Sequence, residues 1–155
     1  FKQFANTFDS VEINNKIKSV MLFAFTHELG HALMGTNGIK PNDSGNSELL
    51  ADKFATYFIL NNLDQGDKIV LDSALYMLMQ PPGRVTPLND KHPMGSDRFI
   101  NLNCWVYGKD PVKYQYLIDQ NLLNKDRSTT CQQEYTQIKD SWEEALKSRF
   151  KQTAA

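Results

Sequence analysis

Residues 11–35 have the sequence VEINNKIKSVMLFAFTHELGHALMG, and this stretch indicates what kind of fold the chain builds. Asp9 or Ser10 can cap a helix here with Glu12 in its first turn, and Gly35 is a typical helix end. The pattern predicts a first helix over about residues 11–34. Its apolar residues recur at the three- and four-residue spacing of a helix: Ile13, Ile17, Val20, Met21, Ala24 and Phe25.

Two more helices are predicted downstream by similar signals. Asn46 or Ser47 can cap a second helix that ends near Asn61. Asp67 can cap a third helix that runs to about Gln80, where two prolines end it. The buried side of the second helix is expected to consist of Leu49, Leu50, Phe54, Ala55, Phe58 and Ile59.

The second half of the chain also predicts helices. A fourth is expected from Pro93 to Gly108, because proline suits the first turn of a helix. Asp110 and Pro111 repeat that capping arrangement for a fifth. A last helix is expected to begin near residues 128–130. It carries apolar residues on one side: Tyr135, Ile138, Trp142, Ala145 and Leu146.

Length and composition favour one mainly α globular domain over residues 1–155. Of the 155 residues, 41% are hydrophobic and 23% charged, and the formal net charge is -1. A charge so close to zero does not favour nucleic acid as a partner. The longest apolar run, residues 20–25, is far shorter than the roughly 20 residues of a membrane span. No convincing strand pattern is present, although a short β-hairpin in the Pro-rich residues 80–87 is left open.

The segment His27-Glu28-Leu29-Gly30-His31 is an HExxH pattern inside the first predicted helix. Residues four apart lie one turn from each other, so both imidazoles can reach a single ion. Glu28 lies beside them and is placed to reach water on that ion rather than the ion itself. Gly30 has no side chain and allows another segment to approach closely, although it lowers helix propensity. The pattern predicts a metal site with Glu28 as general base.

A third metal ligand is expected from the second predicted helix. Catalytic zinc sites usually have three protein ligands and one open position, and Glu48 can supply the third. Asp52, one turn later, can accept a hydrogen bond from the far nitrogen of a ligand histidine and so fix its tautomer. Two imidazoles with one carboxylate suit zinc better than magnesium or calcium. One Zn²⁺ held by His27, His31 and Glu48 is therefore predicted.

These segments resemble the gluzincin metallopeptidases, which include thermolysin-like and HtpX-like enzymes. In gluzincins a glutamate from a second helix completes the zinc site, and an aspartate four residues later supports it. Residues 92–98, HPMGSDR, are similar to a His-Pro segment followed by arginine in the HtpX-like enzymes. The resemblance implies that His92 is an oxyanion stabiliser or an auxiliary ligand, and that Arg98 contacts Glu48.

A closer resemblance, to an uncharacterised bacterial family described as metallopeptidases, covers most of the chain. Its members are typically exported and begin with a signal peptide and a β-containing region. The resemblance implies export, although this chain has no signal peptide. It also implies that this chain is the catalytic part of a longer protein, or that the strand lining its substrate cleft comes from elsewhere. The similar segments are residues 27–33, 48–52, 97–99, 103–108 and 131–135, together with Trp142.

The two cysteines, Cys104 and Cys131, have two interpretations. In an exported protein they can form one disulfide, which would stabilise the fold by about 3 kcal/mol. In a reducing compartment they are two small buried apolar residues.

The function predicted from these features is zinc-dependent hydrolysis of peptide bonds in a peptide or protein substrate. Glu28 takes a proton from the attacking water, and zinc with His92 stabilises the negative oxygen. The alternative is a zinc-binding interaction module without turnover. The presence of Glu28 favours the enzyme, because a structural site needs no base. The sequence makes no prediction of oligomeric state.

Overall fold

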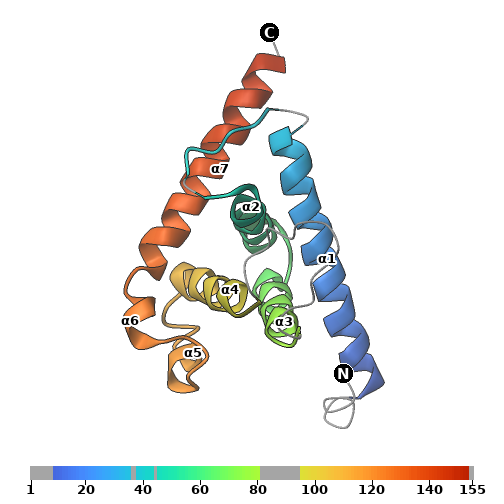
Figure 1. The fold of residues 1–155 in the computed structure, drawn as a ribbon, viewed down its shortest axis with the longest axis vertical. Coiled ribbons are helices and arrows are strands. Elements are labelled where there is room, and N and C mark those ends of the chain that lie inside the picture. Colours follow the sequence, from blue (N-terminus) through green and yellow to red (C-terminus); the bar gives the residue numbers. More distant parts are fainter. Residues whose placement is uncertain (1–8, 36–37, 44, 81–94, 154–155) are drawn as a thin grey trace.

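The chain folds into helices joined by turns and short loops (Figure 1), and the computed structural model describes residues 9–35, 38–43, 45–80 and 95–153. No strand occurs within those ranges, so the predicted mainly α fold class is confirmed. Residues 81–87, where a β-hairpin was left open, lie outside the described part. The helices are α1 (Ser10–Gly35), α2 (Ser47–Asn62), α3 (Gly66–Leu78), α4 (Gly95–Lys109), α5 (Tyr116–Asp119), α6 (Lys125–Ser128) and α7 (Cys131–Thr153).

The first two helices begin and end within a residue or so of their predicted bounds. Asn46 caps α2 by accepting a hydrogen bond from the backbone N–H of Leu49 at 2.9 Å. The side of α1 that packs inward, however, is not its apolar stripe. Met21 and Phe25 are 66% and 68% exposed. The residues that α1 buries are Ser19, Phe23, Thr26, His27 and Gly30.

The third helix begins two residues earlier than predicted, with Gln65 rather than Asp67 as its capping residue. Gln65, in a left-handed conformation with φ 54°, precedes the helix without a side-chain cap. The carboxylate of Asp67 accepts hydrogen bonds from Lys113, at 2.6 Å, and from the hydroxyl of Tyr114. Asp67 thus binds a distant segment instead. Pro93, the predicted start of the fourth helix, lies outside the described residues.

The predicted fifth helix is replaced by turns and two short helices. The side chain of Asp110 accepts a hydrogen bond from the backbone of Lys113 at 3.0 Å, but only α5 follows. Asn121, with φ 56°, interrupts the chain after α5. Asn124 then caps α6, a four-residue helix that the sequence did not predict.

Helix α2 lies between α1 and α7 (Figure 1) and packs against α1, α3 and α7, while α4 packs on α3 and α7. Trp105 of α4 and Trp142 of α7 are almost completely buried, and the ring of Phe54 from α2 lies 4.7 Å from that of Trp142. The apolar side predicted for the last helix is the side that packs on the core. None of the described helices is both long and apolar enough to cross a membrane.

A buried aspartate joins α3 to α1. Asp72 accepts hydrogen bonds from Ser19 at 2.9 Å, Lys16 at 3.0 Å and Lys68 at 2.8 Å. Burial by itself raises the pKa of Asp72, but these hydrogen bonds outweigh burial and the pKa lies below its ordinary value. The ionised carboxylate of Asp72 therefore joins α3 to α1.

Candidate metal centre

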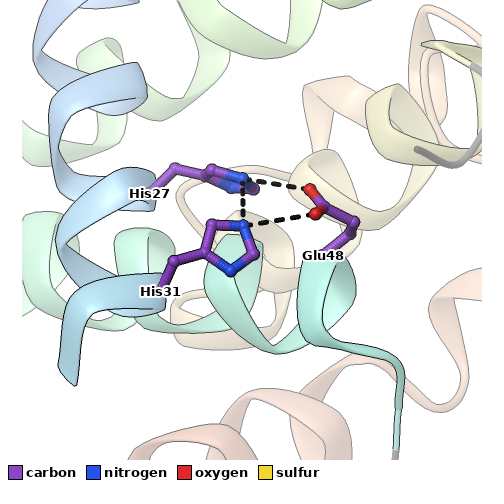
Figure 2. A group of neighbouring side chains, drawn as sticks. All are labelled: His27, His31 and Glu48. Carbon is purple, nitrogen blue, oxygen red and sulfur yellow. Dashed lines mark hydrogen bonds and ion pairs between the residues drawn. The ribbon is translucent and has the colours of Figure 1, made fainter. Parts of the chain in front are cut away.

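The two histidines of α1 point to the same place. His27 is buried and His31 partly buried, and their Nε2 atoms lie 3.1 Å apart (Figure 2). This proximity follows from the helix, because residues four apart are neighbours on its surface. The HExxH spacing therefore places both ring nitrogens at one point.

The third side chain comes from the first turn of α2. The Glu48 carboxylate has one oxygen 3.3 Å from Nε2 of His27 and the other 3.3 Å from Nε2 of His31 (Figure 2). The cap at Asn46 sets where α2 begins, and so places Glu48 in the turn that faces α1. The structure thus brings together the three residues that the sequence predicts as ligands.

A close approach of the two helices makes this meeting possible. A Cβ atom added to Gly30 would lie 3.1 Å from Cδ1 of Phe54 and 3.2 Å from Cα of Ala51. Both distances are shorter than ordinary van der Waals contacts. The absence of a side chain at position 30 lets α2 lie directly against α1, next to His31 and about one turn from His27.

The three side chains fit a metal ion. Ligand atoms placed about 2.0 to 2.1 Å from a tetrahedral ion lie about 3.3 to 3.4 Å from one another. Here the two Nε2 atoms are 3.1 Å apart, and each lies 3.3 Å from a different oxygen of the Glu48 carboxylate. They form a group within the described residues whose ligand atoms all lie within 4.8 Å of one another. One carboxylate and two imidazoles are typical of sites for borderline metals.

Asp52 fixes which nitrogen of His27 faces the site. Nδ1 of His27 lies 2.8 Å from Oδ1 of Asp52. An ionised carboxylate only accepts, so the ring proton lies on Nδ1 and the Nε2 lone pair points toward His31 and Glu48. A lone pair that faces a carboxylate favours a cation between them.

Arg98 holds Asp52 from the other side, and its expected contact with Glu48 stays a prediction. Its Nε donates to Oδ2 of Asp52 at 2.8 Å and its Nη2 to Oδ1 at 2.6 Å. The Glu48 carboxylate is turned toward the two imidazoles. Burial raises the pKa of Asp52, but hydrogen bonds from His27 and Arg98 outweigh it, and the pKa lies below its ordinary value.

Glu28 and His92 complete the set of predicted site residues. Glu28 is exposed and follows His27 directly on α1, so its side chain leaves the helix about 100° around the axis from that of His27. It borders the cluster without being one of the three converging side chains. His92 lies outside the described residues.

The close approach expected at Gly30 is present, and the structure names its partners, Phe54 and Ala51. One interaction of the site was not predicted from the sequence: the bidentate pair of Arg98 with Asp52, which joins residues 46 apart. No local spacing indicates such a pair.

Comparison with known proteins places the chain in a family. No curated protein and no solved structure matches it. The model of the family DUF4344, whose description is "Putative metallopeptidase", matches residues 1–146. That range includes both helices of the cluster and the arginine that supports them, as well as the segments on which the bacterial resemblance rests. The chain therefore belongs to this family of metallopeptidases.

Proposed function

We propose that the protein is a zinc-dependent endopeptidase of the gluzincin type. The observation that carries the proposal is the convergence of His27, His31 and Glu48, with Glu28 exposed beside them. Two histidines from one helix and a glutamate from the next are the ligand set of a catalytic zinc site. Arg98, which follows the His-Pro segment, belongs to the same site, because it binds the aspartate that supports His27.

The residues of the chain have separate roles in hydrolysis. His27, His31 and Glu48 would hold the zinc, which would supply a water with a pKa lowered toward about 7 and a positive charge beside the scissile carbonyl. Glu28 takes the proton from the attacking water and delivers it to the leaving amine. His92 donates to the negative oxygen that develops on the carbonyl. Asp52, held by Arg98, keeps the proton of His27 on Nδ1, so that Nε2 remains a ligand.

We also propose that the protein works outside the cytosol. Its two cysteines form a disulfide between α4 and α7, with an S–S distance of 2.03 Å. Such bonds persist in oxidising compartments and are rare in the cytosol. This supports the export implied by the bacterial resemblance.

The role of Glu28 is tested with an isosteric substitution. Glu28→Gln is expected to lower the rate of cleavage of fluorescein-labelled casein by about 10²- to 10⁴-fold, which is the usual contribution of a general base. Zinc content, measured by elemental analysis, should remain at one ion per chain, because Glu28 is not among the converging ligands. Glu12→Gln, at the far end of the same helix, is the matched control and should cleave at the wild-type rate.

The alternatives give different results. Equal cleavage by wild type and Glu28→Gln would refute the role of Glu28. Zinc bound by a wild-type protein that cleaves nothing would indicate a binding module. A His31→Ala variant that retains full zinc would contradict the ligand set.

A further inference from the structure

One face of α1 is apolar and exposed beside Glu28. Met21 is 66% exposed, Phe25 68% and Ile17 44%. Helices α2 and α3 pack against α1 (Figure 1), and the exposed fractions of these three side chains place them on the part of the helix surface that this packing leaves open. Large apolar residues are expected to be buried, and an aligned group of them on a surface usually marks an interaction site.

The apolar face runs into the candidate site. At about 100° per residue, Ile17, Met21, Phe25 and Glu28 fall within a sector of about 80° around the helix axis. At about 1.5 Å per residue, Phe25 lies about 4.5 Å before Glu28 along the axis and Met21 about 10.5 Å before it. The exposed side chains and the proposed base therefore share one face.

The inner side of α1 explains why this face is unusual. That side carries Ser19, which binds Asp72, and His27, which faces the cluster. Phe23 on that side is also buried in the core, whereas Met21 and Phe25 lie on the exposed side. Packing within this fold therefore does not account for these two side chains.

We propose that Met21 and Phe25 bind bulky apolar side chains of the substrate, within about three residues of the cleaved bond. The proposal rests on the proposed function and names its substrate class: extended polypeptide rich in large apolar residues, as in unfolded proteins. An extended peptide advances about 3.3 Å per residue. Side chains one to three residues from a bond cleaved beside Glu28 therefore reach the positions of Phe25 and Met21.

The area of this face suits a peptide better than a second copy of the chain. With large side chains of about 200 Å² each, the exposed parts of Ile17, Met21 and Phe25 add up to roughly 350 Å². A stable protein dimer buries about 800 Å² on each partner. A few side chains of an extended peptide match the smaller area.

The test measures binding without turnover. Zinc-loaded Glu28→Gln is titrated into two short fluorescein-labelled peptides that differ only in having leucine or serine at alternate positions, and anisotropy gives the Kd. The leucine peptide is expected to bind about tenfold more tightly. Adding Phe25→Ser should reduce this ratio to below about threefold, because the loss of one apolar contact weakens binding of the leucine peptide by about threefold. Val112→Ser is the matched control, because Val112 is 89% exposed and lies outside α1.

The outcomes separate this inference from the proposed function. An unchanged leucine-to-serine ratio in Phe25→Ser, with a circular dichroism spectrum like that of wild type, would overturn the inference. So would a wild-type dimer that Phe25→Ser converts to monomer in sedimentation, because a second copy would then cover the face. A Phe25-dependent ratio in a protein whose wild type cleaves no casein would support the apolar surface and refute the peptidase. Casein cleavage without any leucine preference in binding would support the peptidase and refute the apolar binding surface.

Discussion

At the scale of single residues, Asp52 connects the candidate metal centre to the rest of the fold. It accepts from His27 at 2.8 Å and from Arg98 at 2.6 and 2.8 Å. Only 2% of its surface is exposed, so its charge depends on these partners. Asp52 therefore controls the orientation and basicity of a ligand without being one.

We predict that Asp52→Asn weakens zinc binding by about 10- to 100-fold, because a neutral amide no longer makes His27 a stronger ligand. Competition with a fluorescent chelator measures the affinity. Asp72→Asn is the matched control, since Asp72 is also a buried, paired aspartate but binds Lys16 and Ser19 rather than a residue of the cluster. Equal zinc affinities in the two variants would contradict a positioning role for Asp52.

Gly30 supports a second prediction at this scale. Gly30→Ala adds a Cβ 3.1 Å from Phe54 and 3.2 Å from Ala51, which pushes α2 away from α1. The gain of about 1 kcal/mol in helix propensity offsets part of the overpacking cost of about 1 to 3 kcal/mol. We therefore expect a small loss of stability but a clear loss of zinc affinity.

A second glycine on the same helix is the control for that change. A Cβ at Gly35 would meet nothing within 4 Å, so Gly35→Ala should leave zinc affinity unchanged. Calorimetric titration with zinc compares the variants. If Gly30→Ala binds zinc as tightly as wild type, the close approach at Gly30 is not what brings the ligands together.

At the scale of helices, α1 is held by polar contacts at both ends of its buried side. Asp72 of α3 binds Ser19 and Lys16, and Asp52 of α2 binds His27 further along. These contacts select one rotation of α1 about its axis. Apolar burial alone would favour a rotation that covers Met21 and Phe25.

The hydrogen bonds of the ionised Asp72 carboxylate predict that the free energy of unfolding depends on pH. Its pKa in the folded protein lies below the value of about 3.9 expected when unfolded. Its contribution is therefore present above about pH 4 and is lost as the pH falls through the folded pKa. Asp72→Asn should lower the free energy of unfolding by about 2 kcal/mol at pH 7, and the difference should vanish in acid.

Urea unfolding over this pH range measures the difference. Asp126→Asn on the exposed α6 is the control, and a surface change of that kind should shift the free energy by less than about 0.5 kcal/mol at any pH. A difference between wild type and Asp72→Asn that stays constant from neutral to acid pH would show that the charge of Asp72 does not stabilise the fold.

At the scale of the whole molecule, the disulfide between Cys104 and Cys131 joins α4, which carries Arg98, to the long α7. The two cysteines are 27 residues apart in sequence. On the chain-entropy account, closing a loop of this length stabilises the fold by about 3.5 kcal/mol. Both cysteines are completely buried, so the bond is also part of the core.

We predict that the double variant Cys104→Ala, Cys131→Ala loses about 3.5 kcal/mol of unfolding free energy. Urea unfolding with and without a reducing agent measures this. The reducing agent should lower the stability of wild type toward that of the variant and leave the variant unchanged. A variant as stable as oxidised wild type would show that the loop does not contribute.

Most helices of this protein were predictable, because the signals for them are local. Asn46 caps α2 as predicted, and α7 buries the apolar side that its spacing indicates. Where the prediction was wrong, a distant partner is the reason. Asp67 does not cap α3, because its carboxylate accepts hydrogen bonds from Lys113 and Tyr114.

The sequence by itself determined the pairing of the two imidazoles, since four residues along a helix always bring side chains to one face. It also determined that a carboxylate with its supporting aspartate begins the next helix. Only the tertiary structure decided that α1 turns these groups inward and Met21 and Phe25 outward. It also decided that Arg98 binds Asp52. These choices depend on the packing of segments far apart along the chain, and such packing has no local pattern.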